Sequence, residues 1–86
     1  MADALDVRVR YFAGAAKAAG VSEERLAVPR GTTVGVLADT LVARHGTALA
    51  RVLAASSFLL DEVTADAARP LHDGALVDVL PPFAGG

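Results

Sequence analysis

The 86-residue chain contains no cysteine, and Lys17 is its only lysine. Without cysteine the chain can form no disulfide, no thiolate nucleophile and no Cys-ligated metal or iron–sulfur site, so the plant-type ferredoxins are excluded. The formal net charge is −2, whereas binding to a nucleic-acid backbone needs clustered Lys and Arg. We therefore expect no thiol chemistry and no nucleic-acid partner.

Long apolar runs are also absent. No apolar stretch approaches the roughly 18 residues of a transmembrane helix, and the early Asp3 and Asp6 do not fit the basic and apolar regions of a signal peptide. We therefore expect no membrane association and, by default, a cytoplasmic location. Apolar residues make up 53% of the chain. That fraction predicts one compact domain with apolar surface left over for a partner.

Hydrophobic periodicity divides the chain into strands and helices. Residues 5–11 alternate apolar and charged side chains, as a half-buried strand does. Residues 34–42 carry apolar side chains at helical spacing, with Thr32 or Thr33 as the cap and Gly46 beyond the end. This segment is the expected core helix. The remaining expected elements are a helical turn at 13–20, a strand at 24–28, a short helix opened by Thr47, and strands at 57–60 and 75–80.

The order of these elements predicts an α+β fold in which a mixed sheet wraps around one main helix. The first two strands are expected to pair antiparallel. Residues 1–80 are expected to form the domain, and residues 81–86 to form a C-terminal tail that continues from the last strand.

The sequence offers little evidence for an internal active site. His45 and His72 are the only histidines, and neither has a neighbouring carboxylate or hydroxyl that would indicate a triad or a metal site, so both are interpreted as structural. Asp61-Glu62 and Asp78 are imaginable as an acid/base pair but are interpreted as solvated. Phosphate-binding and nucleophile-elbow motifs are missing. We expect no metal site and no complete active site in this chain.

The chain ends in Pro81-Pro82-Phe83-Ala84-Gly85-Gly86. Glycine has no Cβ, so the two terminal glycines can enter a channel too narrow for side chains. The two prolines fix φ at about −65° and stiffen the exit from the last strand. At about 3.3–3.6 Å per residue, the six residues can reach roughly 20 Å from the domain.

The carboxylate of Gly86 is the best chemical candidate in the sequence. It is ionised at neutral pH, and a carboxylate resists nucleophiles, so it must first be activated. Adenylation by ATP would give a mixed anhydride, from which a sulfur nucleophile could form a thiocarboxylate and an amine could form an amide. The nucleotide site must belong to a partner enzyme. An ordinary frayed terminus is the alternative interpretation of this ending.

Four segments together resemble a known family. They are Val9–Ala13, Thr33-Val34 with Leu37 and Leu41, Leu71–Gly74, and above all the Pro-Pro-x-x-Gly-Gly ending. With them the whole chain resembles the small subunit of molybdopterin synthase (MoaD), within the ubiquitin-like sulfur carriers that include ThiS. The paired prolines favour the molybdopterin branch. Residues 60–69 depart from the family's asparagine-containing strand, so no role is transferred to them.

The resemblance implies a ubiquitin-like β-grasp fold and a two-stage cycle. An E1-like enzyme of the MoeB type would adenylate Gly86 with ATP and Mg²⁺, and a sulfur donor would convert it to a thiocarboxylate. The tail would then enter a MoaE-like large subunit, in a heterotetramer, and pass sulfur to cyclic pyranopterin monophosphate for molybdenum cofactor biosynthesis. This chain itself would bind no cofactor.

The same resemblance assigns roles within the tail. Gly86 would carry the adenylate and then the sulfur, and Gly85 with Ala84 would thread the narrow approach. The residues expected to dock against the partner are Phe83, Pro82 and Pro81. Phe58 and Leu60 are weaker interface candidates, with burial in the core as the alternative.

Other functions remain open at this point. The chain could be a ThiS-like carrier that delivers sulfur to thiamine or to another sulfur-containing metabolite. It could instead be a β-grasp interaction module whose Gly-Gly is incidental, because a fold alone does not fix a function. A ubiquitin-type protein modifier is a further alternative.

Overall fold

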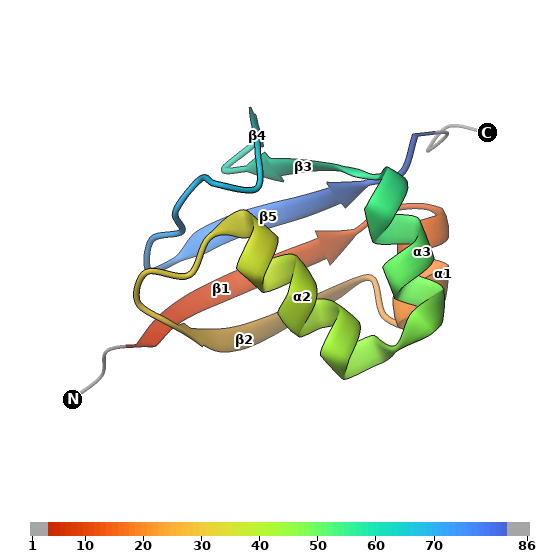
Figure 1. Ribbon diagram of the computed structural model, residues 1–86, viewed down its shortest axis with the longest axis horizontal. Helices are drawn as coiled ribbons and strands as arrows, with labels where there is room; N and C mark the ends of the chain where they lie inside the picture. The colour runs from red at the N-terminus through yellow and green to blue at the C-terminus, as the bar shows by residue number, and fades with distance from the viewer. Residues whose placement is uncertain (1–3, 83–86) are drawn as a thin grey trace.

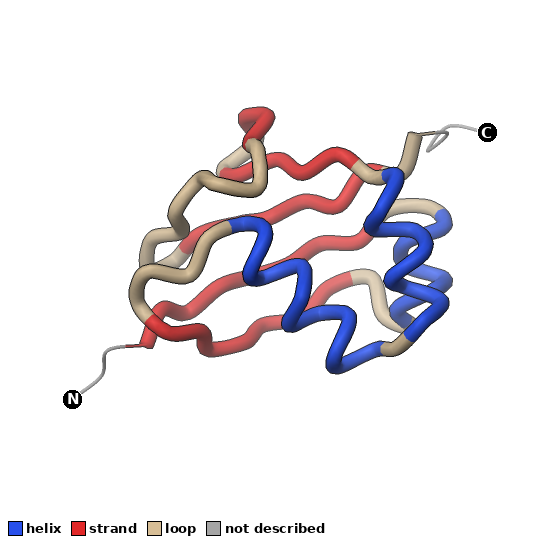
Figure 2. The backbone as a smooth tube through the Cα atoms, viewed as in Figure 1, coloured by secondary structure: helices blue, strands red, loops and turns tan. Residues whose placement is uncertain are grey.

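The computed structural model describes residues 4–82 (Figure 1). Its elements in chain order are β1 (Ala4–Tyr11), α1 (Gly14–Ala19), β2 (Glu23–Pro29), α2 (Val34–His45), α3 (Thr47–Ala55), β3 (Ser57–Leu60), β4 (Val63–Ala65) and β5 (Ala75–Leu80). Helix α2 crosses one face of the sheet, and α1 and α3 pack against each other at one end of it (Figures 1 and 2). Within the described residues, no helix has the length and apolar character needed to cross a membrane.

The strands form one mixed sheet in the order β2-β1-β5-β3-β4. Strands β1 and β5 are parallel, and every other neighbouring pair is antiparallel. The predictions of a mixed sheet and of an antiparallel first pair are therefore confirmed. Because β5 pairs with both β1 and β3, the strand that leads into the C-terminal tail lies in the middle of the sheet.

The core lies between the sheet and the helices. Alternation in β1 turns four side chains inward, and all four are buried: they are Leu5, Val7, Val9 and Tyr11. In β5 the inward residues are completely buried, and on the opposite face Asp78 is buried while Leu76 and Leu80 are half-buried. Burying one Val or Leu side chain contributes about 1.5–3 kcal/mol, so this face supplies much of the folding free energy.

Helix α2 begins and ends as the sequence predicts. Thr33 is its N-cap, with its hydroxyl oxygen accepting a hydrogen bond from the Val36 amide at 3.2 Å. Val34, Leu37 and Leu41 form its buried stripe. The helix ends at Gly46, whose φ of +95° is open to glycine and strained for other residues, and α3 follows directly.

One element was not predicted. Strand β4 lies within residues 60–69, for which no element was expected, whereas α1 and α3 lie where the helical turn at 13–20 and the short helix opened by Thr47 were expected. The β3–β4 hairpin turns at Asp61 and Glu62, with φ of +50° and +70°. Hairpin turns with positive φ usually carry Gly or Asn, so the sequence lacked the turn signal, and three residues are too few to show a period.

Candidate functional site

The candidate site is the end of β5 and the tail that follows it. Pro81 is half-buried and Pro82 is exposed. The other predicted tail residues, Phe83, Ala84, Gly85 and Gly86, lie outside the described residues. The structure therefore positions the base of the tail.

The base of the tail is held from both sides. Leu80, the last residue of β5, pairs with Ser57 of β3, and Val79 pairs with both Phe58 and Tyr11. The amide of Phe12 also donates to the Val79 carbonyl at 3.3 Å. Proline has no N–H and cannot continue such a ladder, so sheet pairing stops at Leu80 and the tail leaves from a fixed point.

A partly buried ion pair supports β5 just before the tail. The Arg10 guanidinium donates two hydrogen bonds to the Asp78 carboxylate, at 2.6 and 2.8 Å. Glu62 lies 3.8 Å from Arg10, and the guanidinium carbon lies 5.7 Å from the centroid of the Phe12 ring. The hydrogen bonds to Asp78 raise the pKa of Arg10 above its ordinary value, against the opposing effect of burial. This arrangement locks the outer face of β5 to β1.

The expectation that Asp78 is solvated is wrong. Arg10 and Asp78 are 68 positions apart in sequence but face each other in the parallel β1–β5 register. That register cannot be read from either strand alone. The one available signal was a lone carboxylate in the otherwise apolar strand 75–80, because a buried charge needs a partner.

The prediction that neither histidine has a carboxylate partner is also wrong. His45 Nε2 lies 2.5 Å from Glu24 Oε2, and the Tyr11 hydroxyl donates to the same oxygen at 2.6 Å. Burial alone would raise the pKa of Glu24, but the hydrogen bonds from Tyr11 and His45 outweigh it and lower that pKa. The pKa of Tyr11 is raised, chiefly by burial and secondly by the hydrogen bond to Glu24. The cluster joins the end of α2 to β2 and β1.

His72 has its own partner at the β3–β4 turn. Its Nε2 lies 2.5 Å from Asp61 Oδ2, and its Nδ1 lies 2.9 Å from the Asp73 carbonyl. Both partners are acceptors, so each ring nitrogen must donate. A histidine ring carries an N–H on both nitrogens only when it is protonated, so both hydrogen bonds form together only in that state. The hydrogen bond to Asp61 raises the pKa of His72, and the same bond lowers the pKa of Asp61. Among residues 4–82, no group of three or more His, Cys, Asp or Glu side chains could hold a metal ion.

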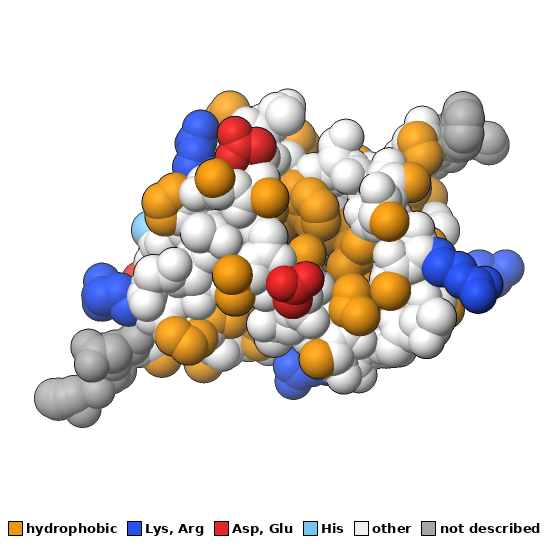
Figure 3. Space-filling view, viewed as in Figure 1, with side chains coloured by type: hydrophobic (Ala, Val, Ile, Leu, Met, Phe, Trp, Pro, Cys, Tyr) orange, Lys and Arg blue, Asp and Glu red, His pale blue; other side chains and the backbone are white. Residues whose placement is uncertain are grey.

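The two weaker interface candidates differ in position. Leu60 is buried in the core. Phe58 is half-buried and borders an apolar groove of about 230 Å³ between α2 and α3, whose other lining residues include Val42 and Leu53. Figure 3 shows hydrophobic side chains gathered in a hollow on this helical face.

The ThiS family model matches residues 9–86, from the middle of β1 to the last glycine. The chain belongs to the ThiS family. No curated protein sequence matches it. The predicted ubiquitin-like β-grasp fold is confirmed by solved structures.

Three of those structures illustrate the likeness. SAMP1 from Haloferax volcanii is 28% identical with a TM-score of 0.82, over 94% of this chain and 99% of that chain. A putative molybdopterin converting factor, subunit 1, from Pyrococcus furiosus is 26% identical with a TM-score of 0.79, over 92% and 99%. A chain in the complex of subunits 1 and 2 of molybdopterin-converting factor from Helicobacter pylori shares the fold, at 24% identity and a TM-score of 0.62, over 95% and 100%.

Proposed function

We propose that this chain is the sulfur-carrier small subunit of a molybdopterin synthase. The carboxyl group of Gly86 is adenylated, converted to a thiocarboxylate, and donates its sulfur to cyclic pyranopterin monophosphate in molybdenum cofactor biosynthesis. The observation that carries the proposal is the ThiS family match, which runs through the tail to Gly86. The likeness to a putative molybdopterin converting factor subunit supports the pterin branch.

The proposed chemistry divides between this chain and its partners. An oxygen of the Gly86 carboxylate attacks the α-phosphorus of ATP and releases pyrophosphate, and a sulfur donor then displaces AMP from the acyl adenylate. An E1-like, MoeB-type enzyme supplies the site for ATP and Mg²⁺. A MoaE-like large subunit then receives the tail in a cytoplasmic heterotetramer and supplies the pterin site.

The geometry at the base of the tail supports a carrier role. Leu80 is held in the sheet by β3, and Pro82 is already exposed. A partner that takes the tail therefore meets a pre-organised base, which lowers the entropic cost of binding. The two glycines at the tip add no side-chain bulk.

Tandem mass spectrometry of the C-terminal tryptic peptide tests the proposal. The peptide from Val52 to Gly86 contains no Met, Cys or Trp, so a gain of about 16 Da cannot come from methionine oxidation. The protein is isolated from its native host lacking the large subunit, so that the charged form accumulates. We expect the gain to localise to Gly86. An unmodified Gly86 in cells that make the activating enzyme would contradict the proposal.

A matched pair of glycine variants tests the threading role. Gly85→Ala adds a Cβ to the tip and is expected to slow sulfur transfer in a reconstituted assay while the fold stays intact. Gly14→Ala is the control, because an added Cβ at Gly14 meets nothing within 4 Å. Equal transfer rates for the two variants would remove Gly85 from the threading role.

Protein modification is the second candidate function, and the likeness to SAMP1, a small archaeal modifier protein, favours it. Here an amine attacks the acyl carbon of the Gly86 adenylate, displaces AMP and forms an amide. The same digest would then contain the Val52–Gly86 peptide joined through Gly86 to lysines of other proteins.

One residue appended after Gly86 should abolish both functions. Activity retained after that extension would indicate an interaction module, and co-purification of a different large partner would indicate a ThiS-like carrier for thiamine.

A further inference from the structure

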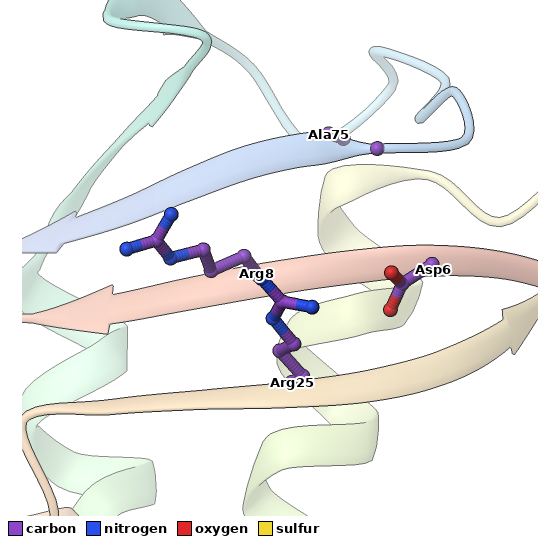
Figure 4. A pocket seen from close by; sticks show the side chains of 5 residues that line it. Asp6, Arg8, Arg25 and Ala75 are labelled. Atoms are coloured by element: carbon purple, nitrogen blue, oxygen red, sulfur yellow. The ribbon is translucent and has the colours of Figure 1, made fainter.

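A second feature lies on the outer face of the sheet, at the end remote from the tail. Asp6, Arg8, Arg25, Gly74 and Ala75 line an open pocket of about 140 Å³ (Figure 4). Gly74 and Ala75 stand at the start of β5, whereas the tail leaves from its other end. Five residues of strand at about 3.3 Å each separate the two ends by roughly 16 Å.

Arg8 and Arg25 are direct cross-strand partners in the β1–β2 register. Like charges directly opposite each other destabilise an antiparallel pair. Arg8 is partly balanced, since its Nε lies 2.7 Å from Glu23 Oε2 and both side chains are nearly half exposed. Arg25 makes no ion pair within 4.0 Å among residues 4–82. In Figure 4 the Arg25 side chain reaches over β1 on the side of Arg8 that faces Asp6, while the Arg8 guanidinium points along β1 away from Asp6.

The charges of the pocket favour one kind of ligand. A guanidinium binds a carboxylate through two parallel hydrogen bonds. Asp6 forms part of the same wall and repels anions in proportion to their charge, so the pocket favours a singly charged carboxylate over a doubly charged phosphate. The pocket is open to solvent, where an isolated ion pair is worth at most about 1 kcal/mol. The carboxylate must therefore belong to a larger molecule that gains contacts elsewhere.

The surface beside the pocket supplies such contacts. Leu76 of β5 faces Arg8 in the register and is half-buried on the outer face. A standard protein interface covers about 800 Å² on each partner, roughly 30 Å across. A protein that holds the tail and lies along this face would therefore reach the pocket, and arginine is enriched at such interfaces.

We propose that the Arg8–Arg25 pocket binds the carboxylate of an acidic side chain on the large partner subunit. The identity of that partner rests on the function proposed above. The pocket would then steer the approach of the large subunit and fix its orientation, while the tail at the other end of β5 enters the active site.

Association kinetics of the full chain with the purified large subunit test this. Arg25→Glu is expected to slow association about tenfold at low salt, with a smaller difference at high salt. Arg25→Gln should give an intermediate rate. The matched control is Arg51→Glu, which changes the net charge equally at an exposed position on α3, in the helical layer on the opposite face of the sheet. Equal rates for the Arg25→Glu and Arg51→Glu variants would overturn the proposal.

A partner-independent measurement separates this inference from the proposed function. Because a single exposed ion pair is weak, an NMR titration is carried to high probe concentration with N-acetylglutamate amide and, in parallel, with N-acetylglutamine amide. The amides of Arg8, Arg25 and Gly74 should shift more with the glutamate probe, and Arg25→Gln should abolish the difference. If the wild-type chain does not bind the large subunit, the proposed function fails. The titration then decides by itself whether the pocket binds a carboxylate. Equal shifts with the two probes would overturn the pocket.

Discussion

At the scale of single residues, Asp78 shows how a charge is accommodated in a central strand. Its side chain is 4% exposed, while that of its partner Arg10 is 32% exposed. A buried carboxylate is costly unless it is paired and hydrogen-bonded, and the two short bonds to Arg10 meet both requirements. Arg10 in turn covers the carboxylate from solvent, so the pair works as one unit.

Replacing Asp78 should therefore cost stability. Asp78→Ala leaves Arg10 without its two charge-assisted hydrogen bonds, and we expect a loss of about 1–3 kcal/mol in the free energy of unfolding, measured with urea. The control is Glu62→Gln, since Glu62 is 3.8 Å from Arg10 and 76% exposed. That variant should change stability by less than about 0.5 kcal/mol. Equal losses would show that burial of Asp78 is energetically unimportant.

The Asp61–His72 pair predicts a pH-dependent contribution to stability. The folded pKa of His72 is raised and that of Asp61 is lowered. The pair therefore contributes fully between the two unfolded pKa values, near pH 5. Its contribution is lost as pH rises through the raised pKa of His72, or falls through the lowered pKa of Asp61. Both side chains are about half exposed, so the effect is small.

His72→Gln tests this dependence. We expect the variant to melt a few degrees below the wild-type chain at about pH 5, and the difference to shrink towards zero at about pH 9. NMR titration of His72 should show a pKa above that of a histidine in the unfolded chain. A melting difference that is equal at the two pH values would remove the charged pair as its cause.

At the scale of elements, the sequence predicts those whose period is long enough to recognise. Alternation over β1 and the apolar stripe of α2 place both elements and their buried faces. Strand β4 has three residues and a turn without glycine, so neither period nor turn chemistry marks it. For the site, the candidate reactive group at the glycine-terminated ending could be proposed from the sequence alone. The Arg10–Asp78 pair and the Arg8–Arg25 pocket could not, because both depend on which strands are neighbours and in what register.

The cap of α2 can be tested by making the same threonine-to-alanine change at the cap and inside the helix. Thr33→Ala removes the acceptor for the Val36 amide and should destabilise the protein by about 1 kcal/mol. Thr40→Ala replaces an exposed threonine in the helix interior, whose hydroxyl bonds back to the Val36 carbonyl. That change should be neutral or stabilising, because alanine has the higher helix propensity. Urea unfolding of the two variants compares them, and equal losses would contradict the capping role.

At the scale of the whole molecule, stability and proposed chemistry belong to different parts of the chain. All the described core residues lie between Leu5 and Val79, and the ion pairs of the two histidines and of Asp78 join elements within the same region. The proposed reactive group lies at Gly86, beyond the last strand. A partner can therefore bind and modify the tail without disturbing the packing that holds β5 in place.

This separation predicts the outcome of removing residues 83–86. The truncated chain keeps every strand contact of β5, so its free energy of unfolding should stay within about 0.5 kcal/mol of the full chain, while sulfur transfer should be abolished. Val77→Ala is the complementary variant: Val77 is completely buried, and losing two methyl groups should cost about 2 kcal/mol while leaving a competent tail. Its transfer rate, measured at a temperature where it remains folded, should match that of the wild-type chain. A truncated chain that unfolds much more readily would mean that the tail packs on the domain. The folded body would then extend beyond the end of β5.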